Sequence, residues 1–87
     1  MKEIEIIPIA LRKAARRGIT REWIDNTVLN PEQVMSGYGG RKVAQSKIMI
    51  EGKEYLLRVV YQESEEKHTV VTAYLTSQIS RYWKEAE

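Results

Sequence analysis

Apolar residues recur at helical spacing near the start of the chain, and this spacing gives way to a period of two after residue 42. Residues 3–7 alternate weakly, which indicates a short strand. The helical pattern follows and contains Ile7, Ala10, Leu11, Ala14 and Ala15. Residues three and four apart share a helix face, so this pattern predicts an amphipathic helix. Gly18 suits the left-handed residue that ends such a helix.

A second helix is predicted immediately after the first. Thr20 can cap it, because its hydroxyl can accept from N–H groups of the first turn. Glu22 in that turn favours the helix dipole. The buried stripe contains Trp23, Ile24, Thr27 and Val28. Pro31 ends the helix, because proline biases the preceding residue away from helical geometry.

The rest of the chain predicts an antiparallel meander. Residues 43–50 alternate as a strand, and residues 51–54 form a tight turn. Residues 55–62 and 69–75 are two further strands, both apolar on both faces. Ser77 is predicted to cap a last helical turn. The expected fold is a single α+β domain over residues 1–87, with two N-terminal helices packed on a three- to four-stranded antiparallel sheet.

Composition narrows the classes of chemistry. The 87 residues include no cysteine and one histidine, His68, which is expected in an exposed polar turn. Disulfides, thiolate metal sites and a Ser-His-Asp triad are therefore not expected, and no cofactor is predicted. No apolar run approaches the ~20 residues of a membrane span. The acidic start of the chain is unlike a signal peptide, so mature sequence and a cytoplasmic location are predicted.

Charge is distributed unevenly, although the net charge is only +2. Residues 10–21 contain five basic residues and no acid, and further basic residues follow between 41 and 47. The acids gather at residues 63–66 and near the end of the chain. This distribution predicts a surface that attracts phosphates, although a solvated helix face is the alternative. The candidate nucleic-acid-binding residues are Lys13, Arg16, Arg17 and Arg41.

The chemical candidates suit RNA cleavage without a metal. Arg58 interrupts an apolar strand, so it faces solvent or a polar cleft. Cationic groups can stabilise the charge that builds on a phosphoryl group under attack by the 2′-hydroxyl, and a tyrosine can move protons. The candidate catalytic residues are Arg58, Arg81, Tyr82 and Lys42. Trp83 is expected to anchor the C-terminal segment, residues 73–84, rather than stack on a base.

The glycine-rich segment at residues 37–40 is not expected to bind a nucleotide. It follows a helix and precedes a strand, whereas a phosphate-binding loop opens a helix. It also lacks the Lys-Ser or Lys-Thr pair that follows such a loop. The segment is predicted to be a mobile linker, and a loop that contacts nucleic acid is the alternative.

Six short motifs occur in an order that resembles a known family. They are Arg17-Gly18-Ile19-Thr20, Asn30-Pro31-Glu32, Gly40-Arg41-Lys42, Leu57-Arg58-Val59-Val60-Tyr61, Val70-Val71-Thr72-Ala73-Tyr74 and Arg81-Tyr82. The chain resembles small, mostly uncharacterised bacterial and archaeal domains that are similar to the RelE/ParE and BrnT toxins of type II toxin–antitoxin systems. The resemblance implies a RelE-like fold, an antitoxin partner covering the basic face, and cleavage of RNA, free or on the ribosome. Residues at matching positions are Arg17, Lys42, Arg58, Tyr74 and Arg81.

One departure from this family bears on activity. The family usually has a histidine eight residues before the arginine of its Arg-Gly-Ile motif, and Ile9 stands there in this chain. The chain is then a weak enzyme, or uses Tyr82 or Lys13 for proton transfer, or only binds. The last alternative is a nucleic-acid- or protein-binding module, with exposed strand edges that could pair with a second copy.

Overall fold

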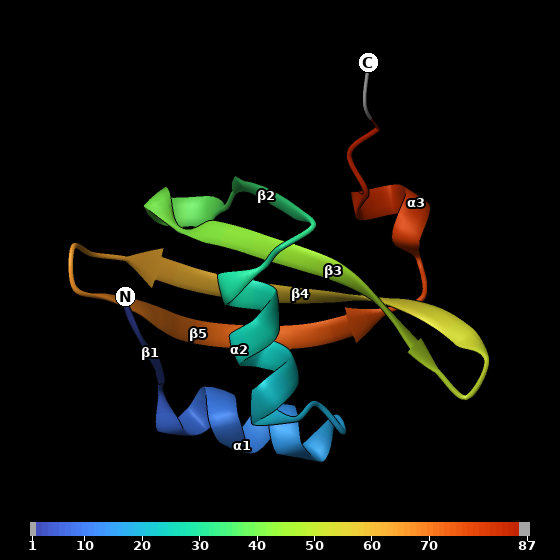
Figure 1. Cartoon of the computed structure of the whole chain (residues 1–87), viewed down its shortest axis with the longest axis horizontal. Helices are drawn as coiled ribbons and strands as arrows, with labels where there is room; N and C mark the ends of the chain where they lie inside the picture. The colour runs from blue at the N-terminus through green and yellow to red at the C-terminus, as the bar shows by residue number, and fades with distance from the viewer. Residues whose placement is uncertain (1, 86–87) are drawn as a thin grey trace.

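A five-stranded mixed sheet forms the centre of the computed structural model, which describes residues 2–85 (Figure 1). The strands lie in the order β1-β5-β4-β3-β2. Their bounds are β1 Glu3–Ile6, β2 Gln33–Ser36, β3 Lys42–Ile50, β4 Lys53–Glu63 and β5 Lys67–Thr76. The helices are α1 Pro8–Arg16, α2 Arg21–Leu29 and the short α3 Ile79–Tyr82, and Tyr38–Gly40 form one 3₁₀ turn, η1.

Both N-terminal helices form as the sequence predicts. Pro8 begins α1, where its missing N–H group costs no hydrogen bond. Gly18 follows α1 with a φ of 74°, the left-handed geometry expected after a helix. In α2 the Thr20 hydroxyl accepts from the N–H group of Trp23 at 3.1 Å, which confirms the predicted cap. Neither helix is long and apolar enough to span a membrane, and the same holds for every helix within residues 2–85.

The sheet has more strands than the sequence predicted, and it is not purely antiparallel. The meander β3-β4-β5 is confirmed, but β1 adds to β5 in parallel and β2 adds to β3 as an antiparallel edge. β1 confirms the short strand predicted at residues 3–7, whereas β2 was not predicted; each is four residues long and lies at a sheet edge. So short an edge strand carries only two residues per face, too few for a clear alternating pattern.

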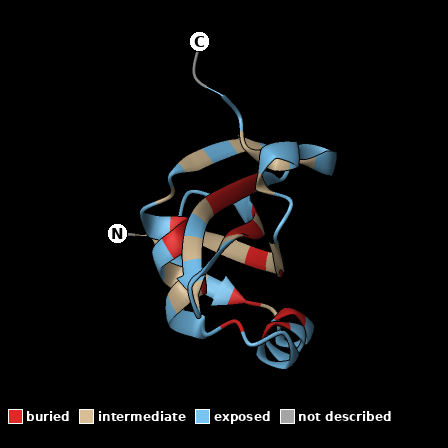
Figure 2. Ribbon diagram, turned by 90° about the vertical axis from the view of Figure 1, so that its right-hand side faces the viewer, coloured by how far each residue is buried: buried red, intermediate tan, exposed pale blue. Residues whose placement is uncertain are grey.

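The two faces of the sheet have different partners. Leu57, Val59 and Tyr61 of β4 join the core beneath α1 and α2, and we call this the helix face. Figure 2 shows buried segments on both the strands and the helices. Successive side chains of a strand point to opposite faces, so Leu56 and Arg58 lie on the other face, called the tail face. The chain after β5 covers part of it, through α3 and the residues that follow.

Two local predictions near the ends of strands are wrong. Ser77 does not cap α3, because its N-cap residue is Gln78 and makes no side-chain capping bond. Instead the Thr76 hydroxyl accepts from the N–H group of Gln78 at 3.0 Å. The glycine-rich segment is a structured connection between β2 and β3 rather than a linker after a helix. It is closed by a 2.6 Å bond from the Gly37 N–H group to the Arg41 carbonyl.

Candidate functional site

Arg58 lies at the centre of the tail face and is only 8% exposed. Its Nε donates to Gln45 Oε1 at 2.9 Å and its Nη1 donates to the Tyr74 hydroxyl at 2.6 Å. Nη2 lies 3.3 Å from Met35 Sδ. Gln45 and Tyr74 are the residues directly opposite Arg58 on the two neighbouring strands. The sheet register therefore fixes the direction of the guanidinium group.

Two aromatic rings lie beside this guanidinium group. The Tyr82 ring of α3 stacks on it, with 4.2 Å between Arg58 Cζ and the ring centroid. The Tyr74 ring centroid is 5.8 Å from the same atom. Arg81 lies on the Tyr82 ring as well, at 5.6 Å, and its side chain is exposed. The Tyr82 ring thus lies within cation–π distance of both Arg58 and Arg81.

Hydrogen bonds from two glutamines hold the tail in place. Gln45 Nε2 donates to the Tyr82 carbonyl at 3.1 Å and to Gln33 Oε1 at 2.8 Å. Gln33 bonds both the N–H group and the carbonyl of Lys84, at 3.0 and 2.5 Å. Lys47 Nζ lies 4.1 Å from the Trp83 ring centroid. Trp83 is therefore engaged at the tail face, as an anchor would be.

The charge of Arg58 has no carboxylate partner among residues 2–85. The ion pairs in this part of the chain involve other cations, and the partners of Arg58 are an amide, a phenol, a thioether and a ring. Burial of a charged group without a counter-ion is costly, because its solvation is lost. Such a cation is well suited to receive an anion from outside the chain.

The structure places Lys42 away from Arg58. Lys42 pairs with Tyr61 in the β3–β4 register and therefore lies on the helix face. Its ammonium forms an ion pair with Glu63 at 2.5 Å. The hydrogen bond that Lys42 donates to Glu63 raises the pKa of Lys42. The prediction that Lys42 lies beside Arg58 is therefore wrong. Lys42 is three residues from Gln45, the partner of Arg58 on β3, and an odd separation along a strand places two side chains on opposite faces.

The predicted nucleic-acid-binding residues do not gather around Arg58 either. Lys13 and Arg16 are exposed on α1, which packs on the helix face. Arg17 Nη1 donates to the Ala73 carbonyl of β5 at 2.8 Å. Arg41 is exposed at the start of β3. Lys13, Arg16 and Arg17 thus form a basic surface on α1 and at its end, on the helix side of the sheet, whereas Arg41 lies apart from them at the β2–β3 connection.

His68 is not the exposed turn residue that the sequence predicted. It lies within β5, and its side chain is only 13% exposed. Its ring packs edge-on against Tyr61, with 5.2 Å between centroids. The buried Nδ1 has no hydrogen-bond partner within residues 2–85 and lies 3.9 Å from Glu63 Oε2. The turn is shorter than expected because β5 begins at Lys67.

Glu63 forms ion pairs with both Lys2 and Lys42, and these contacts should make the stability of the fold sensitive to acid. Hydrogen bonds from Lys2 and Lys42 lower its pKa from 4.5 to about 2. A lowered carboxyl pKa contributes stability that is fully present above pH 4.5 and is lost as the pH falls towards about 2. We expect Glu63→Gln to flatten this part of the stability–pH profile, measured as the urea midpoint at a series of pH values. Glu54→Gln, at an exposed carboxylate outside the ion pairs of residues 2–85, is the control. An unchanged slope in Glu63→Gln contradicts this assignment.

Gln45 and Gln33 are the site residues that sequence reasoning missed. Gln45 is fully buried and orients Arg58, while Gln33 holds the tail. A signal for Gln45 exists in the sequence. The two-residue turn at Glu51-Gly52 places Ile50 opposite Lys53, and counting back along both strands places Gln45 opposite Arg58.

Most of the chain matches a known protein family. The family described as a domain of unknown function, DUF4258, matches residues 10–75, which is most of the 87-residue chain. The chain belongs to the DUF4258 family. The matched segment of this DUF4258 chain contains Arg58, Gln45 and Tyr74, whereas Arg81 and Tyr82 lie beyond it. No curated protein and no solved structure matches the chain significantly.

The described residues offer no cluster suited to a metal ion. Within residues 2–85, no group of three histidine, cysteine, aspartate or glutamate side chains lies close enough together to hold one. The tail face presents two guanidinium groups, of Arg58 and Arg81, and two phenols, of Tyr74 and Tyr82. Such groups can bind an oxyanion in a fork and exchange protons with it.

Proposed function

We propose that this chain is the toxin of a type II toxin–antitoxin pair and that it cleaves RNA at the tail face without a metal. One observation carries the proposal. Arg58 is a buried cation with no carboxylate partner in the described chain, and it lies beneath the Tyr82 ring, against which the exposed Arg81 also lies. A phosphodiester supplies the missing negative charge. The order of sequence motifs, which resembles RelE/ParE and BrnT toxins, supports the same proposal.

The proposed reaction begins with capture of a phosphate by Arg81. In the structure the Tyr82 ring covers the Arg58 guanidinium. In the proposed reaction this ring therefore moves aside before the phosphate reaches Arg58. The 2′-hydroxyl attacks the adjacent phosphorus, and its proton leaves to water. The bond to the 5′-oxygen of the next nucleotide breaks, and Tyr82 gives that oxygen a proton. Arg58 and Arg81 stabilise the charge on the phosphoryl oxygens, which is usually the largest catalytic contribution.

A non-catalytic RNA-binding module is the second candidate, and two observations favour it. Ile9, at the position of the family histidine, is 51% exposed on α1, on the helix side of the sheet. Lys42 is held by Glu63 on that same face. Neither an imidazole nor this lysine therefore reaches the phosphate bound at Arg58. The second candidate keeps the phosphate site and omits bond cleavage.

The proposal also assigns partners. RNA, free or on the ribosome, is the substrate, and an antitoxin encoded nearby covers the basic surface around α1. The exposed Leu11 and Ile9 give that surface an apolar component suited to a protein partner. The proposed location is the cytoplasm. A homodimer is a further possibility that the edge strand β2 could support by pairing with a second copy.

Cleavage in the presence of a chelator tests the proposal. We expect purified protein in excess EDTA to cut single-stranded RNA and leave a 2′,3′-cyclic phosphate, and to leave an oligonucleotide of the same sequence intact when every sugar is 2′-deoxy. The products are resolved on a denaturing gel and by mass spectrometry. Intact RNA that binds with an affinity falling steeply with salt establishes the binding module instead. Absence of both cleavage and binding rejects both candidates.

A further inference from the structure

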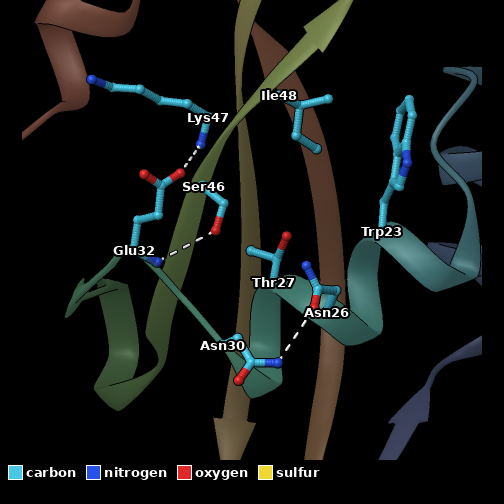
Figure 3. A pocket seen from close by; sticks show the side chains of 8 residues that line it. All are labelled: Trp23, Asn26, Thr27, Asn30, Glu32, Ser46, Lys47 and Ile48. Atoms are coloured by element: carbon cyan, nitrogen blue, oxygen red, sulfur yellow. Dashed lines mark hydrogen bonds between the residues drawn. The ribbon is translucent and has the colours of Figure 1, made fainter.

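A second concave site lies on the helix face, between α2 and β3 (Figure 3). Its volume is about 380 Å³, which lies within the range of small-molecule sites. The side chains that matter for recognition are Trp23, Asn26, Asn30, Glu32, Ser46 and Ile48. Ser46 is adjacent to Gln45, which faces the tail. The sheet therefore separates this cavity from the Arg58 site.

The charge of the cavity is set by Glu32. Oε1 of Glu32 accepts from the N–H group of Lys47 at 2.6 Å, which holds the carboxylate at the cavity wall. Oε2 forms no hydrogen bond within residues 2–85. Lys47 lines the cavity through its backbone, while its ammonium lies over Trp83 on the tail face. A site with one carboxylate and no facing cation disfavours phosphates and favours a neutral or cationic ligand with N–H donors.

The other walls suit a flat ring. Trp23 stands at the opposite end of the cavity from Glu32, and Ile48 adds apolar surface (Figure 3). The Asn26 and Asn30 amides line the floor and share one bond of 3.3 Å, which leaves other donors and acceptors of both amides for a ligand. An aromatic wall with amides and a carboxylate is the combination that stacks on a base and reads its edge.

We propose that this cavity binds a nucleobase of the guanine class. Guanine presents two adjacent N–H donors, which a carboxylate accepts together, and a carbonyl that an asparagine amide can meet. Its ring stacks on the Trp23 indole, and an attached ribose remains at the open mouth of the cavity. The proposed ligand carries no phosphate, so the assignment is independent of RNA cleavage at Arg58.

Guanosine binding tests the proposal with the full chain. In a Trp83→Phe background, Trp23 is the only tryptophan, so its fluorescence reports on the cavity alone. We expect saturable quenching by guanosine and a matching heat of binding by calorimetry, with at least tenfold weaker binding of adenosine. Glu32→Gln, which keeps an oxygen that can accept from Lys47, should weaken guanosine binding by about tenfold, because a hydrogen bond to a charged acceptor is lost.

Two control variants keep the test decisive. Glu54→Gln, at an exposed carboxylate on β4, should leave guanosine affinity unchanged. Arg81→Ala should also leave it unchanged, which separates this cavity from the tail face. Absence of binding at the solubility limit of guanosine in the folded Trp83→Phe protein overturns the proposal. Equal affinity for adenosine and guanosine, or for Glu32→Gln and its parent, overturns the guanine assignment.

Discussion

Replacement of Arg58 by alanine should lower the free energy of unfolding by about 3 kcal/mol, because it removes the centre of a buried polar network. Gln45 is fully buried and loses the donor to its Oε1. The Tyr74 hydroxyl loses its 2.6 Å partner, and the Tyr82 ring loses the cation on which it stacks. The cavity left by the side chain adds to the cost. Urea denaturation monitored by circular dichroism measures the change.

Arg58→Met separates the structural role of this residue from its proposed role with phosphate. Methionine fills much of the same volume and removes the charge, so we expect a smaller loss of stability, about half that of Arg58→Ala. RNA cleavage and RNA binding should be lost in both variants. Arg58→Lys keeps a charge but not the fork that reaches Gln45 and Tyr74 together, so it should restore little activity. Full activity in a folded Arg58→Met protein contradicts the proposed phosphate site.

Arg81→Ala should lower the rate of RNA cleavage by about a hundredfold, the effect expected when one well-aimed cationic donor is lost. Stability should change by less than about 0.5 kcal/mol, because the side chain is exposed. Its hydrogen bond, to Gln78 Oε1, is long at 3.5 Å. Single-turnover cleavage at saturating RNA isolates the chemical step, and expression of the wild type should arrest growth while this variant should not.

Arg12→Ala is the matched control for this second prediction. It removes the same charge from an exposed position on α1, at a distance from the tail face. We expect it to leave the single-turnover rate unchanged and at most to weaken RNA binding, chiefly at low salt, where surface charges are least screened. Equal losses of rate in both variants would show that Arg81 contributes only through the overall charge.

Local patterns were sufficient for the helices and the meander. The stripe that contains Ala10 and Ala14 is buried in α1, and the hydroxyl of Thr20 caps α2 as expected. The alternation in residues 43–50 and the turn at Glu51-Gly52 correctly predicted the β3–β4 hairpin. Of the two edge strands, β1 matches the short strand predicted at residues 3–7, whereas β2 was missed, since so short an edge strand buries too little side chain to impose a period.

The site was only partly predictable. Arg58 was recognised because a charge within an apolar strand requires a partner, and Arg81 and Tyr82 because they follow the last strand. The grouping of Lys42 with these residues was wrong, because Lys42 pairs with Glu63. The expectation that His68 is exposed was also wrong. For Lys42 the error concerned the face of the sheet, and for His68 it concerned whether the residue belongs to a strand. Both depend on strand ends and register, which composition does not specify.

By itself, the sequence determined the helices, the three long strands and the residues that carry the candidate chemistry, because periodicity and capping act between residues close along the chain. Only the tertiary structure decided which of these residues meet. It placed the tail over Arg58 through Gln33 and Gln45, paired Lys42 with Glu63 on the opposite face, and formed the cavity beside Trp23. These contacts join residues far apart in the chain, and they follow from strand order and register across the whole sheet.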